Sequence, residues 1–246
     1  MAAAEAEIAR ARLLVLAPDG FEELDRGEDV ELAVYVDESG EERIRAEFPD
    51  ALGSPVEPGW EHRWRAFHRP ARVAGLWVGP PWEKPPPGES AVVVDPGLAF
   101  GTGSHPTTRA CIGLLALLAR TKHGSVLDAG CGSGVLAVAA ARLGFAPVFA
   151  VDADLLAVEV AARTARDNGV AVETRLADVL VDELPATELV VANIELRAVE
   201  ALLARRLWPV AITAGYPAHE TPTVEGWQHS ERVELDGWAA DLLARS

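Results

Sequence analysis

The fold of this chain is decided by the stretch Val126-Leu127-Asp128-Ala129-Gly130-Cys131-Gly132-Ser133-Gly134-Val135. It starts as a short apolar strand, turns through closely spaced glycines and runs into an alanine-rich segment with the pattern of a helix. Glycines at such a turn let the backbone approach a ligand closely, and the helix that follows points its N-terminal amides at that ligand. Because ligands of open parallel sheets bind at the carboxyl ends of strands, we expect a binding site here, formed in part by Gly130 and Gly132.

The spacing of the glycines narrows the class of ligand. A dinucleotide-binding turn has the pattern G-x-G-x-x-G, whereas here the third glycine comes one residue early and position 135 is Val. No Gly-Lys-Ser/Thr triplet follows, which excludes a P-loop. The turn, with Asp128 just before it, resembles the first motif of class I methyltransferases. A purely structural tight turn is the alternative.

Strand-like and helix-like segments alternate after residue 91. Short apolar runs, typical of buried parallel strands, occupy Ser125–Ala129, Pro147–Asp152, Val172–Leu176, Leu189–Asn193 and Val210–Thr213. Helical patterns lie between them at Val135–Leu143, Leu155–Asp167 and Leu196–Leu207. This order predicts an α/β fold with a doubly wound, mostly parallel sheet covered by helices on both faces. The segment Trp227–Leu243 has Gly237 between two alternating runs, which indicates a hairpin at the sheet edge.

The first part of the chain has a different composition. Residues 1–57 are acid-rich, and the alternating stretches Val30–Val36 and Arg43–Phe48 flank a turn, which predicts a β-hairpin after a short helix that ends near Pro18. Residues 58–90 are crowded with Pro and Trp, which predicts a linker whose tryptophans dock on the next domain. We therefore expect an N-terminal module over 1–57, a linker over 58–90 and a main domain over 91–246.

Composition and charge restrict the class of protein. With 246 residues, of which 49% are apolar, the chain is long enough to bury a core without disulfides. Its two cysteines, Cys111 and Cys131, predict free thiols, and the acidic N-terminus without a long apolar run predicts a cytoplasmic protein without a membrane segment. The net charge of −16 disfavours direct nucleic-acid binding and suits a basic partner, although solubility alone is an equally good explanation. No metal site is predicted.

Polar residues follow the next three strands at the edge where the glycine turn lies. Asp152 ends the second strand, about 20 residues after the glycines, where an acid binds ribose hydroxyls. Asp154 has the position of a helix cap. Asp178 follows the third strand and is placed to accept a hydrogen bond from an adenine amine. Asn193 ends the fourth strand at the expected methyl-donor position, with an N-cap of the next helix as the alternative.

The most specific pattern lies upstream, in Phe100-Gly101-Thr102-Gly103-Ser104-His105-Pro106-Thr107-Thr108. It forms a loop before an amphipathic helix that Pro106 begins and that Ser104 or His105 caps. Together with the 128–134 turn, Val151-Asp152 and Ala192-Asn193-Ile194, this loop resembles the ribosomal protein L11 methyltransferase (PrmA) family.

That resemblance implies a seven-stranded Rossmann-like methyltransferase sheet, S-adenosylmethionine as the methyl donor, and a small α+β, ferredoxin-like N-terminal module that is truncated here. It implies that the donor or the methyl-accepting group contacts Thr108, Gly130, Asp152 and Asn193. The implied reaction is methylation of lysine and N-terminal amines of a basic ribosomal protein by a monomeric enzyme.

The chemistry requires an amine that has first lost a proton, since a lysine ammonium with a pKa of about 10.4 has no lone pair. Desolvation and the nearby sulfonium disfavour the charged amine, and the Asn193 carbonyl is suited to orient its N–H bonds. The alternatives are methylation of another protein, a small amine or RNA, and a non-catalytic protein that binds S-adenosylmethionine. The sequence Asn193-Ile194-Glu195-Leu196 lacks the Asn/Asp-Pro-Pro-Tyr/Phe motif of release-factor glutamine and DNA-amine enzymes.

Overall fold

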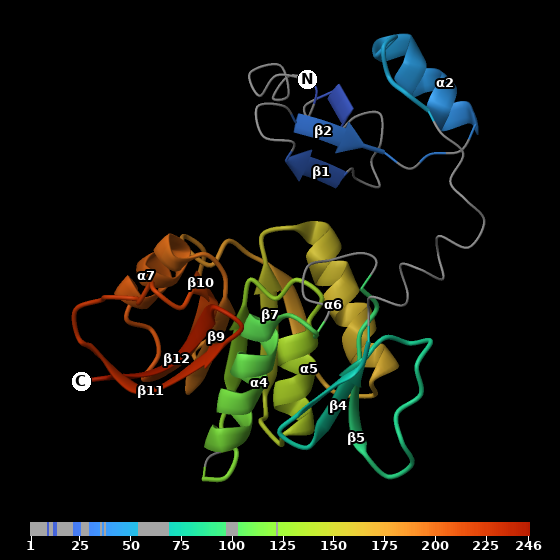
Figure 1. The fold of residues 1–246 in the computed structure, drawn as a ribbon. Helices are drawn as coiled ribbons and strands as arrows, with labels where there is room; N and C mark the ends of the chain where they lie inside the picture. The colour runs from blue at the N-terminus through green and yellow to red at the C-terminus, as the bar shows by residue number, and fades with distance from the viewer. Residues whose placement is uncertain are drawn as a thin grey trace. The chain divides into compact units, whose positions relative to one another are not determined.

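The computed structural model describes residues 9, 12–13, 22–25, 30–34, 36, 38–53, 69–96, 103–121 and 123–246 (Figure 1). The chain forms two compact units, Met1–Trp60 and Glu61–Ser246. Within the described ranges, each helix is too short or too polar to be a candidate transmembrane segment.

A seven-stranded sheet is the centre of the second unit. Its strands are β6 (Val126–Ala129), β7 (Val148–Asp152), β8 (Glu173–Leu176), β9 (Leu189–Asn193), β10 (Val210–Pro217), β11 (Trp227–Leu235) and β12 (Trp238–Arg245). Their spatial order is β11-β12-β10-β9-β6-β7-β8. The strands from β10 to β8 are parallel, and the last two strands of the chain add an antiparallel hairpin at one edge. The predicted doubly wound, mostly parallel sheet is confirmed.

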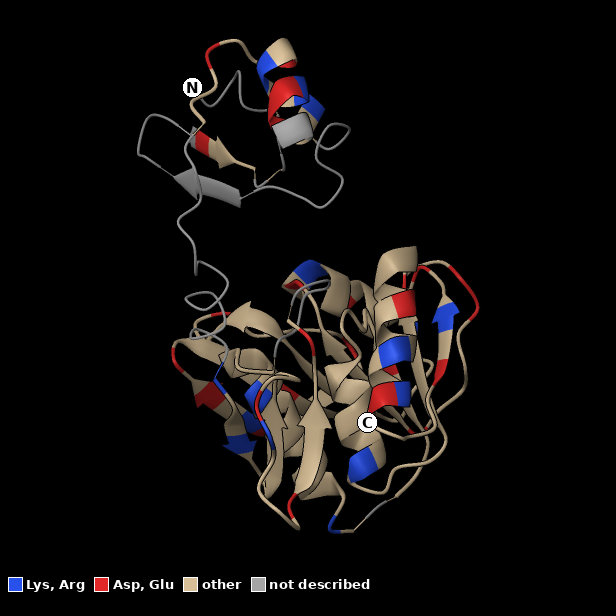
Figure 2. Cartoon of the chain, turned by 90° about the vertical axis from the view of Figure 1, so that its right-hand side faces the viewer, with Lys and Arg blue, Asp and Glu red and all other residues tan. Residues whose placement is uncertain are grey.

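Helices cover both faces of this sheet. They are α4 (Pro106–Leu118), α5 (Val135–Arg142), α6 (Leu155–Asp167) and α7 (Leu196–Ala204). One buried cluster joins α4, α5 and α6 to the sheet, and a second joins α7 to the opposite face. Neighbouring residues of one strand, such as Val126 and Leu127, fall into different clusters because successive side chains point to opposite faces. The face of α6 that points away from the sheet carries charged residues (Figure 2).

The predicted strands of the second unit agree with the observed ones within one residue, except that β10 is four residues longer than predicted. Helix α7 ends at Ala204, three residues before the predicted Leu207, because Arg206 has a left-handed backbone with φ 56°. Trp208, directly after this turn, is fully buried under α7. The early end of α7 therefore allows the large side chain of Trp208 to lie in the core.

The C-terminal hairpin is confirmed. Leu235 pairs with Trp238, so the loop consists of the two residues Asp236 and Gly237, with φ 51° and 81°. Two successive positive φ angles are typical of the type I′ turn, whose twist matches that of antiparallel strands. This hairpin places β12 next to β10 and leaves β11 at the edge of the sheet.

Residues 71–93 form a small three-stranded sheet, so the linker predicted over residues 58–90 is wrong where these strands lie. Its strands are β3 (Ala71–Val73), β4 (Leu76–Gly79) and β5 (Ser90–Val93), with β4 in the middle. The proline clusters lie in the loop between β4 and β5, which is why their presence did not prevent strands on either side. Trp77 is buried, as docking predicted, whereas Trp60 and Trp64 lie outside the described residues.

The first unit contains a two-stranded sheet and a helix. Strand β2 (Val30–Ala33) pairs with β1 (Glu22–Asp25), and not with Arg43–Phe48. That second stretch belongs mainly to helix α2 (Glu38–Glu47), so the predicted hairpin is wrong. The helix has an ion pair between Glu41 and Arg45 one turn apart, at 2.9 Å, and these charges favour the helical period over the strand period.

The short helix predicted before Pro18 is helical at its three described residues, Ala9, Arg12 and Leu13. The rest of that segment lies outside the described residues. This small α+β unit buries apolar side chains of its own, namely those of Ala9, Leu13 and Ile44.

The core on the α4 face predicts a matched pair of stability effects. Leu115 is fully buried and Leu117, on the same helix, is 42% exposed. Leu115→Ala should lower the free energy of unfolding by about 2–5 kcal/mol, because it leaves a cavity in a packed core. Leu117→Ala should change it by less than about 1 kcal/mol. Chemical denaturation followed by circular dichroism measures both, and equal effects would contradict this packing.

Candidate cofactor and active site

The glycine turn after β6 has a backbone that glycine alone adopts easily. Gly130, Gly132 and Gly134 have φ 73°, 50° and 77°. The amides of Gly130 and of the next residue donate to the carbonyl of Val151 on β7, at 2.9 and 3.0 Å. A Cβ on Gly134 would lie 2.9 Å from the Cα of Ala161, so this glycine also allows α5 and α6 to pack closely. The turn is thus held against the second strand and its helix.

Asp128 is a buried carboxyl group that connects β6 to α5. Its Oδ2 accepts a hydrogen bond from the amide of Ala137 at 2.9 Å. Burial raises the pKa of Asp128 to about 8; the Ala137 amide opposes this shift and the nearby charge of Asp152 adds to it. Burial also raises the pKa of the thiols of Cys111 and Cys131, both of which are free, as predicted.

Asp152 joins the glycine turn to the end of β7. One carboxylate oxygen accepts from the amide of Gly132 at 2.9 Å, and the other accepts from the amide of Asp154 at 3.0 Å. Asp154 caps α6 by accepting from the amide of Leu156 at 2.9 Å, as predicted. The sequence prediction that Asp152 and Gly132 meet at one edge is therefore confirmed, although the ligand role of Asp152 stays a prediction.

Asp178 follows the next strand, β8, at the same edge of the sheet. The amide of Ala177 donates to the carbonyl of Asp152 at 2.9 Å, which brings the two segments side by side. The side chain of Asp178 is exposed and accepts from the amide of Leu180 at 2.8 Å, while its own amide donates to Asp182. A carboxylate has further lone pairs, so this local turn leaves Asp178 able to accept from a ligand.

Asn193 is the last residue of β9, the strand that pairs with β6 on the side away from β7. The alternative role of helix cap does not apply to Asn193, because the N-cap of α7 is Glu195. The side-chain amide of Asn193 makes no hydrogen bond to the residues that the structure describes. Its amide is therefore available to a ligand.

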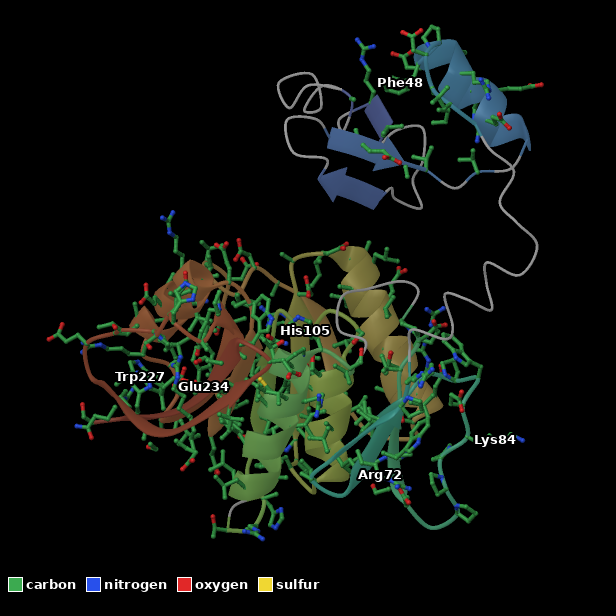
Figure 3. All side chains as sticks on the ribbon, in the orientation of Figure 1. Phe48, Arg72, Lys84, His105, Trp227 and Glu234 are labelled. Atoms are coloured by element: carbon green, nitrogen blue, oxygen red, sulfur yellow. The ribbon has the colours of Figure 1, made fainter. Side chains whose placement is uncertain are left out.

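Thr108 and His105 belong to the start of α4, which packs against β9, β10 and α5. His105, labelled in Figure 3, is the N-cap residue of α4. Burial lowers the pKa of its ring. Its ring lies edge-on to Trp238 with centroids 5.0 Å apart. The hydroxyl of Thr108 is fully buried and has no hydrogen-bond partner among the described residues. A buried hydroxyl without a partner is unfavourable by itself and suggests that a ligand completes it.

Ile194 and Gly215 are two further residues at this edge that the sequence did not predict. Gly215 has φ 104°, and a Cβ there would overlap the carbonyl of Ile194. The side chain of Ile194 reaches the glycine turn, since a Cβ on Gly130 would lie 2.6 Å from its Cγ2. The signal available in the sequence was a glycine near the end of an apolar strand, and its meaning depended on which strand became its neighbour.

The predicted residues on the sheet therefore share one edge, the carboxyl ends of β6, β7, β8 and β9. The chain order reverses there, with β7 on one side of β6 and β9 on the other, which is the switch point where doubly wound folds bind ligands. Positive-φ glycines and the Asp152 carboxylate fit S-adenosylmethionine, a cationic ligand with ribose hydroxyls. The Thr108 hydroxyl and the Asn193 side-chain amide, which have no hydrogen-bond partner among the described residues, are available to the same ligand or to its methyl acceptor.

Comparison with known proteins decides the family. The model of the family described as ribosomal protein L11 methyltransferase (PrmA) matches residues 32–217. The chain belongs to this family.

Members of the PrmA family from two bacteria illustrate the similarity. The ribosomal protein L11 methyltransferase of Symbiobacterium thermophilum is 40% identical over 203 residues, and that of Myxococcus xanthus is 35% identical over 201 residues. These alignments cover 77% and 76% of this chain. The chain spans 66% and 68% of the two relatives, about two thirds of their length.

A solved structure agrees with the fold of this PrmA family member. The ribosomal protein L11 methylase of Lactobacillus delbrueckii subsp. bulgaricus has a TM-score of 0.62 and 27% identity, covering 70% of this chain and 95% of that one. The sheet is thus a Rossmann-like methyltransferase sheet, as the sequence resemblance implied.

The buried Asp128 predicts a pH-dependent stability. A carboxyl group whose pKa rises from about 4 to about 8 on folding stabilises the fold most below pH 4, and this contribution is lost as the pH rises to 8. Asp128→Asn removes the titration and keeps an oxygen for the Ala137 amide. The free energy of unfolding of Asp128→Asn, relative to wild type, should therefore increase by more than about 1.4 kcal/mol between pH 5 and pH 8. A difference that does not change with pH would contradict this environment for Asp128.

Proposed function

We propose that this protein is an S-adenosylmethionine-dependent protein N-methyltransferase that methylates lysine and N-terminal amines of ribosomal protein L11. The observation that carries the proposal is the hydrogen bond from Gly132 to Asp152, which joins the two principal donor-site elements at the switch point of the sheet, 2.9 Å apart. Membership in the PrmA family and the names of the relatives support the acceptor.

Each donor-site residue has a distinct role in this proposal. The glycine turn, with Gly130 and Gly132, gives the donor close access to backbone amides. Asp152 accepts from the ribose hydroxyls, and Asp178 accepts from the adenine amine. The hydroxyl of Thr108, which has no hydrogen-bond partner among the described residues, gains one from the donor.

The bound donor supplies an electrophilic methyl group on a sulfonium. The protein then has to hold a neutral amine in line with it and keep water out. Desolvation of the lysine favours loss of its proton, and the carbonyl oxygen of Asn193 orients the remaining N–H bonds toward the transfer geometry. Asn193 sits at the end of β9, and its amide makes no hydrogen bond to the described residues, so it suits this role.

Charge supports a basic protein as the acceptor. The chain has 38 acidic against 22 basic residues, which attracts a basic ribosomal protein and repels a phosphate backbone. We propose that the first unit recognises this acceptor, because the donor-site candidates all belong to the second. We also propose that the enzyme acts in the cytoplasm as a monomer, without direct contact to nucleic acid.

The experiment that tests the function is turnover with a radiolabelled methyl donor. Purified ribosomal protein L11 should become labelled, and mass spectrometry should locate methyl groups on lysine and the N-terminal amine. If a different protein, a small amine or RNA from a cell extract became labelled instead, that molecule would be the acceptor and ribosomal protein L11 would not. Donor binding without any labelled product would instead indicate a non-catalytic binding protein.

Asp152 should contribute to donor affinity, whereas Asp154 should not. Asp152→Ala should weaken S-adenosylmethionine binding by about 1–3 kcal/mol, the scale of a lost charge-assisted hydrogen bond. Asp154→Ala should lower stability by about 1 kcal/mol through loss of the α6 cap and leave donor affinity unchanged. Calorimetry measures both affinities. Unchanged affinity for Asp152→Ala would remove Asp152 from the site.

Truncation should separate donor binding from acceptor recognition. A protein shortened to start near Pro85 would lack β4, whose Leu76 and Val78 are buried in the main core. A protein that starts at Glu61, the beginning of the second unit, keeps that core. It should bind S-adenosylmethionine almost normally and methylate ribosomal protein L11 far more slowly. Full activity on the protein, or loss of donor binding in a folded truncated protein, would contradict this division.

A further inference from the structure

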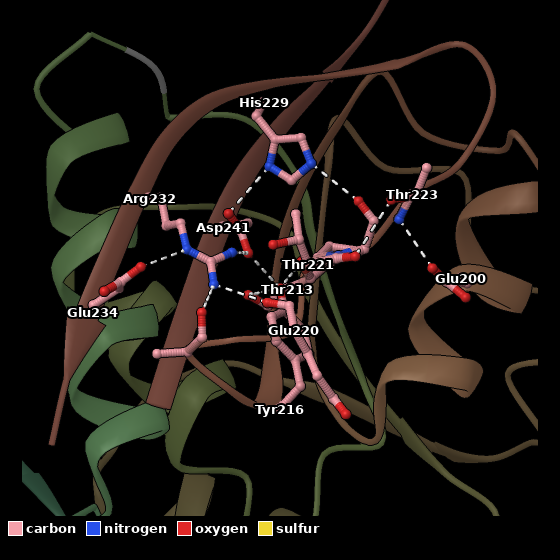
Figure 4. Close-up of polar contacts among 12 residues, drawn as sticks. Glu200, Thr213, Tyr216, Glu220, Thr221, Thr223, His229, Arg232, Glu234 and Asp241 are labelled. Atoms are coloured by element: carbon pink, nitrogen blue, oxygen red, sulfur yellow. Dashed lines mark hydrogen bonds and ion pairs between the residues drawn. The ribbon is translucent and has the colours of Figure 1, made fainter. Parts of the chain in front are cut away.

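A buried polar cluster lies beside the C-terminal end of β10, on the face of the sheet that α7 covers (Figure 4). Its centre is the carboxylate of Asp241, which is fully buried. Three groups bind this carboxylate: the Tyr216 hydroxyl at 2.8 Å, the Arg232 guanidinium at 2.8 Å and the His229 ring at 3.1 Å. A buried carboxylate with a guanidinium and a phenol is compensated for its lost hydration, so the cluster is a fixed point in this part of the sheet.

The cluster spans an irregularity in β10. Thr213 pairs with Asp241 and Ala214 with Ala240, whereas Tyr216 pairs with Ala239. Gly215 is therefore the extra residue of a β-bulge. The hydroxyl of Tyr216 lies 2.8 Å from that of Thr213. Since a phenol has one proton and gives it to Asp241, it accepts from Thr213. Side chains on both sides of the bulge are therefore bound to each other, which fixes its shape.

The bulge lies directly against the residue after Asn193. A Cβ on Gly215 would lie 2.7 Å from the carbonyl carbon and 2.9 Å from the amide nitrogen of Ile194. The amide of Ile194 donates to the carbonyl of Ala214 at 3.1 Å. The backbone of β10 at the bulge therefore determines where the end of β9 lies, because Gly215 has no side chain and the two backbone segments are in direct contact.

Ile194 also connects this arrangement to the donor turn. Its Cγ2 lies where a Cβ of Gly130 would be only 2.6 Å away. Its backbone thus contacts the bulge and its side chain contacts the glycine turn. Asn193, one residue earlier, pairs with Ala214, the residue directly before the bulge.

We propose that Tyr216 and Asp241 are positioning residues for Asn193: by closing the bulge at Gly215 they hold the Asn193 amide at the acceptor side of the donor site. This inference rests on the proposed methyl transfer. It predicts that loss of the Tyr216 hydroxyl changes the orientation of the acceptor amine and leaves the binding of the donor unchanged.

The sequence allows a direct observation of Asn193. The chain contains two asparagines, Asn168 and Asn193, so protein labelled with ¹⁵N-asparagine gives two pairs of side-chain amide signals. Asn168 is an internal reference, because its amide donates to Val93 at 2.7 Å and to Thr164 at 2.8 Å, within other elements. Asn193→Ala assigns the two pairs.

A matched pair of substitutions tests the proposal. Tyr216→Phe and Thr164→Val each remove one buried hydroxyl that makes hydrogen bonds and keep nearly the same shape. Tyr216→Phe should shift or broaden the Asn193 signals and leave those of Asn168 in place, and Thr164→Val should do the reverse. If Tyr216→Phe does not fold, Thr213→Val removes the partner hydroxyl instead.

Kinetics on the full chain give the second measurement. Tyr216→Phe should lower kcat about fivefold, equivalent to one neutral hydrogen bond, with an unchanged Kd for S-adenosylmethionine. Thr164→Val should leave kcat unchanged. In an Asn193→Ala background, Tyr216→Phe should cause no further loss, because the amide that it positions is absent.

The outcomes separate this inference from the proposed function. Unchanged Asn193 signals in folded Tyr216→Phe, or the same fivefold loss in the Asn193→Ala background, would overturn the positioning role while the enzyme remains a methyltransferase. Wild-type protein that transfers no methyl group to any amine would overturn the proposed function and, with it, the catalytic meaning of the cluster.

Discussion

The hydrogen bond from the amide of Gly132 to the carboxylate of Asp152 joins the ends of β6 and β7, the first two strands of the seven-stranded sheet in chain order, at the edge where doubly wound folds bind ligands. It is possible only because Gly132 has a left-handed backbone, and because β6 and β7 are parallel neighbours with their carboxyl ends together. The same carboxylate accepts from Asp154, which caps α6. Strand ends, glycine turn and helix start are thereby placed around one side chain.

A second constraint comes from close contact between backbones. Ile194 touches the space of two glycines, Gly130 on one side and Gly215 on the other. The contact at Gly215 transmits position better than a long side chain would, because a backbone in contact with a backbone has no rotamers to change, whereas the contact at Gly130 is made by the Ile194 side chain. The donor half of the proposed site and the acceptor half therefore depend on one apolar residue that has no reactive group of its own.

Two segments of the chain differ from their sequence prediction for physical reasons. The alternating pattern of Arg43–Phe48 suggested a strand, but charge pairs one helical turn apart favoured α2. Prolines around residues 80–87 suggested a linker, yet they fill a loop, and the strand Leu76–Gly79 before it is fully buried. In both places a short pattern was compatible with two structures, and packing partners elsewhere in the chain selected one of them.

The sequence by itself determined the alternating strands and helices of the second unit, the glycine turn, the acid that ends β7 and the Asn that ends β9. These features are local: apolar runs with fixed periods, and residue types that only some backbones or caps accept. Only the tertiary structure decided that Thr108 has no hydrogen-bond partner among the described residues, that the N-cap position of α7 is Glu195 and not Asn193, and that Gly215 lies against Ile194. Those facts depend on contacts between segments far apart in the chain, and the register and bulge that create them have no signature within either segment.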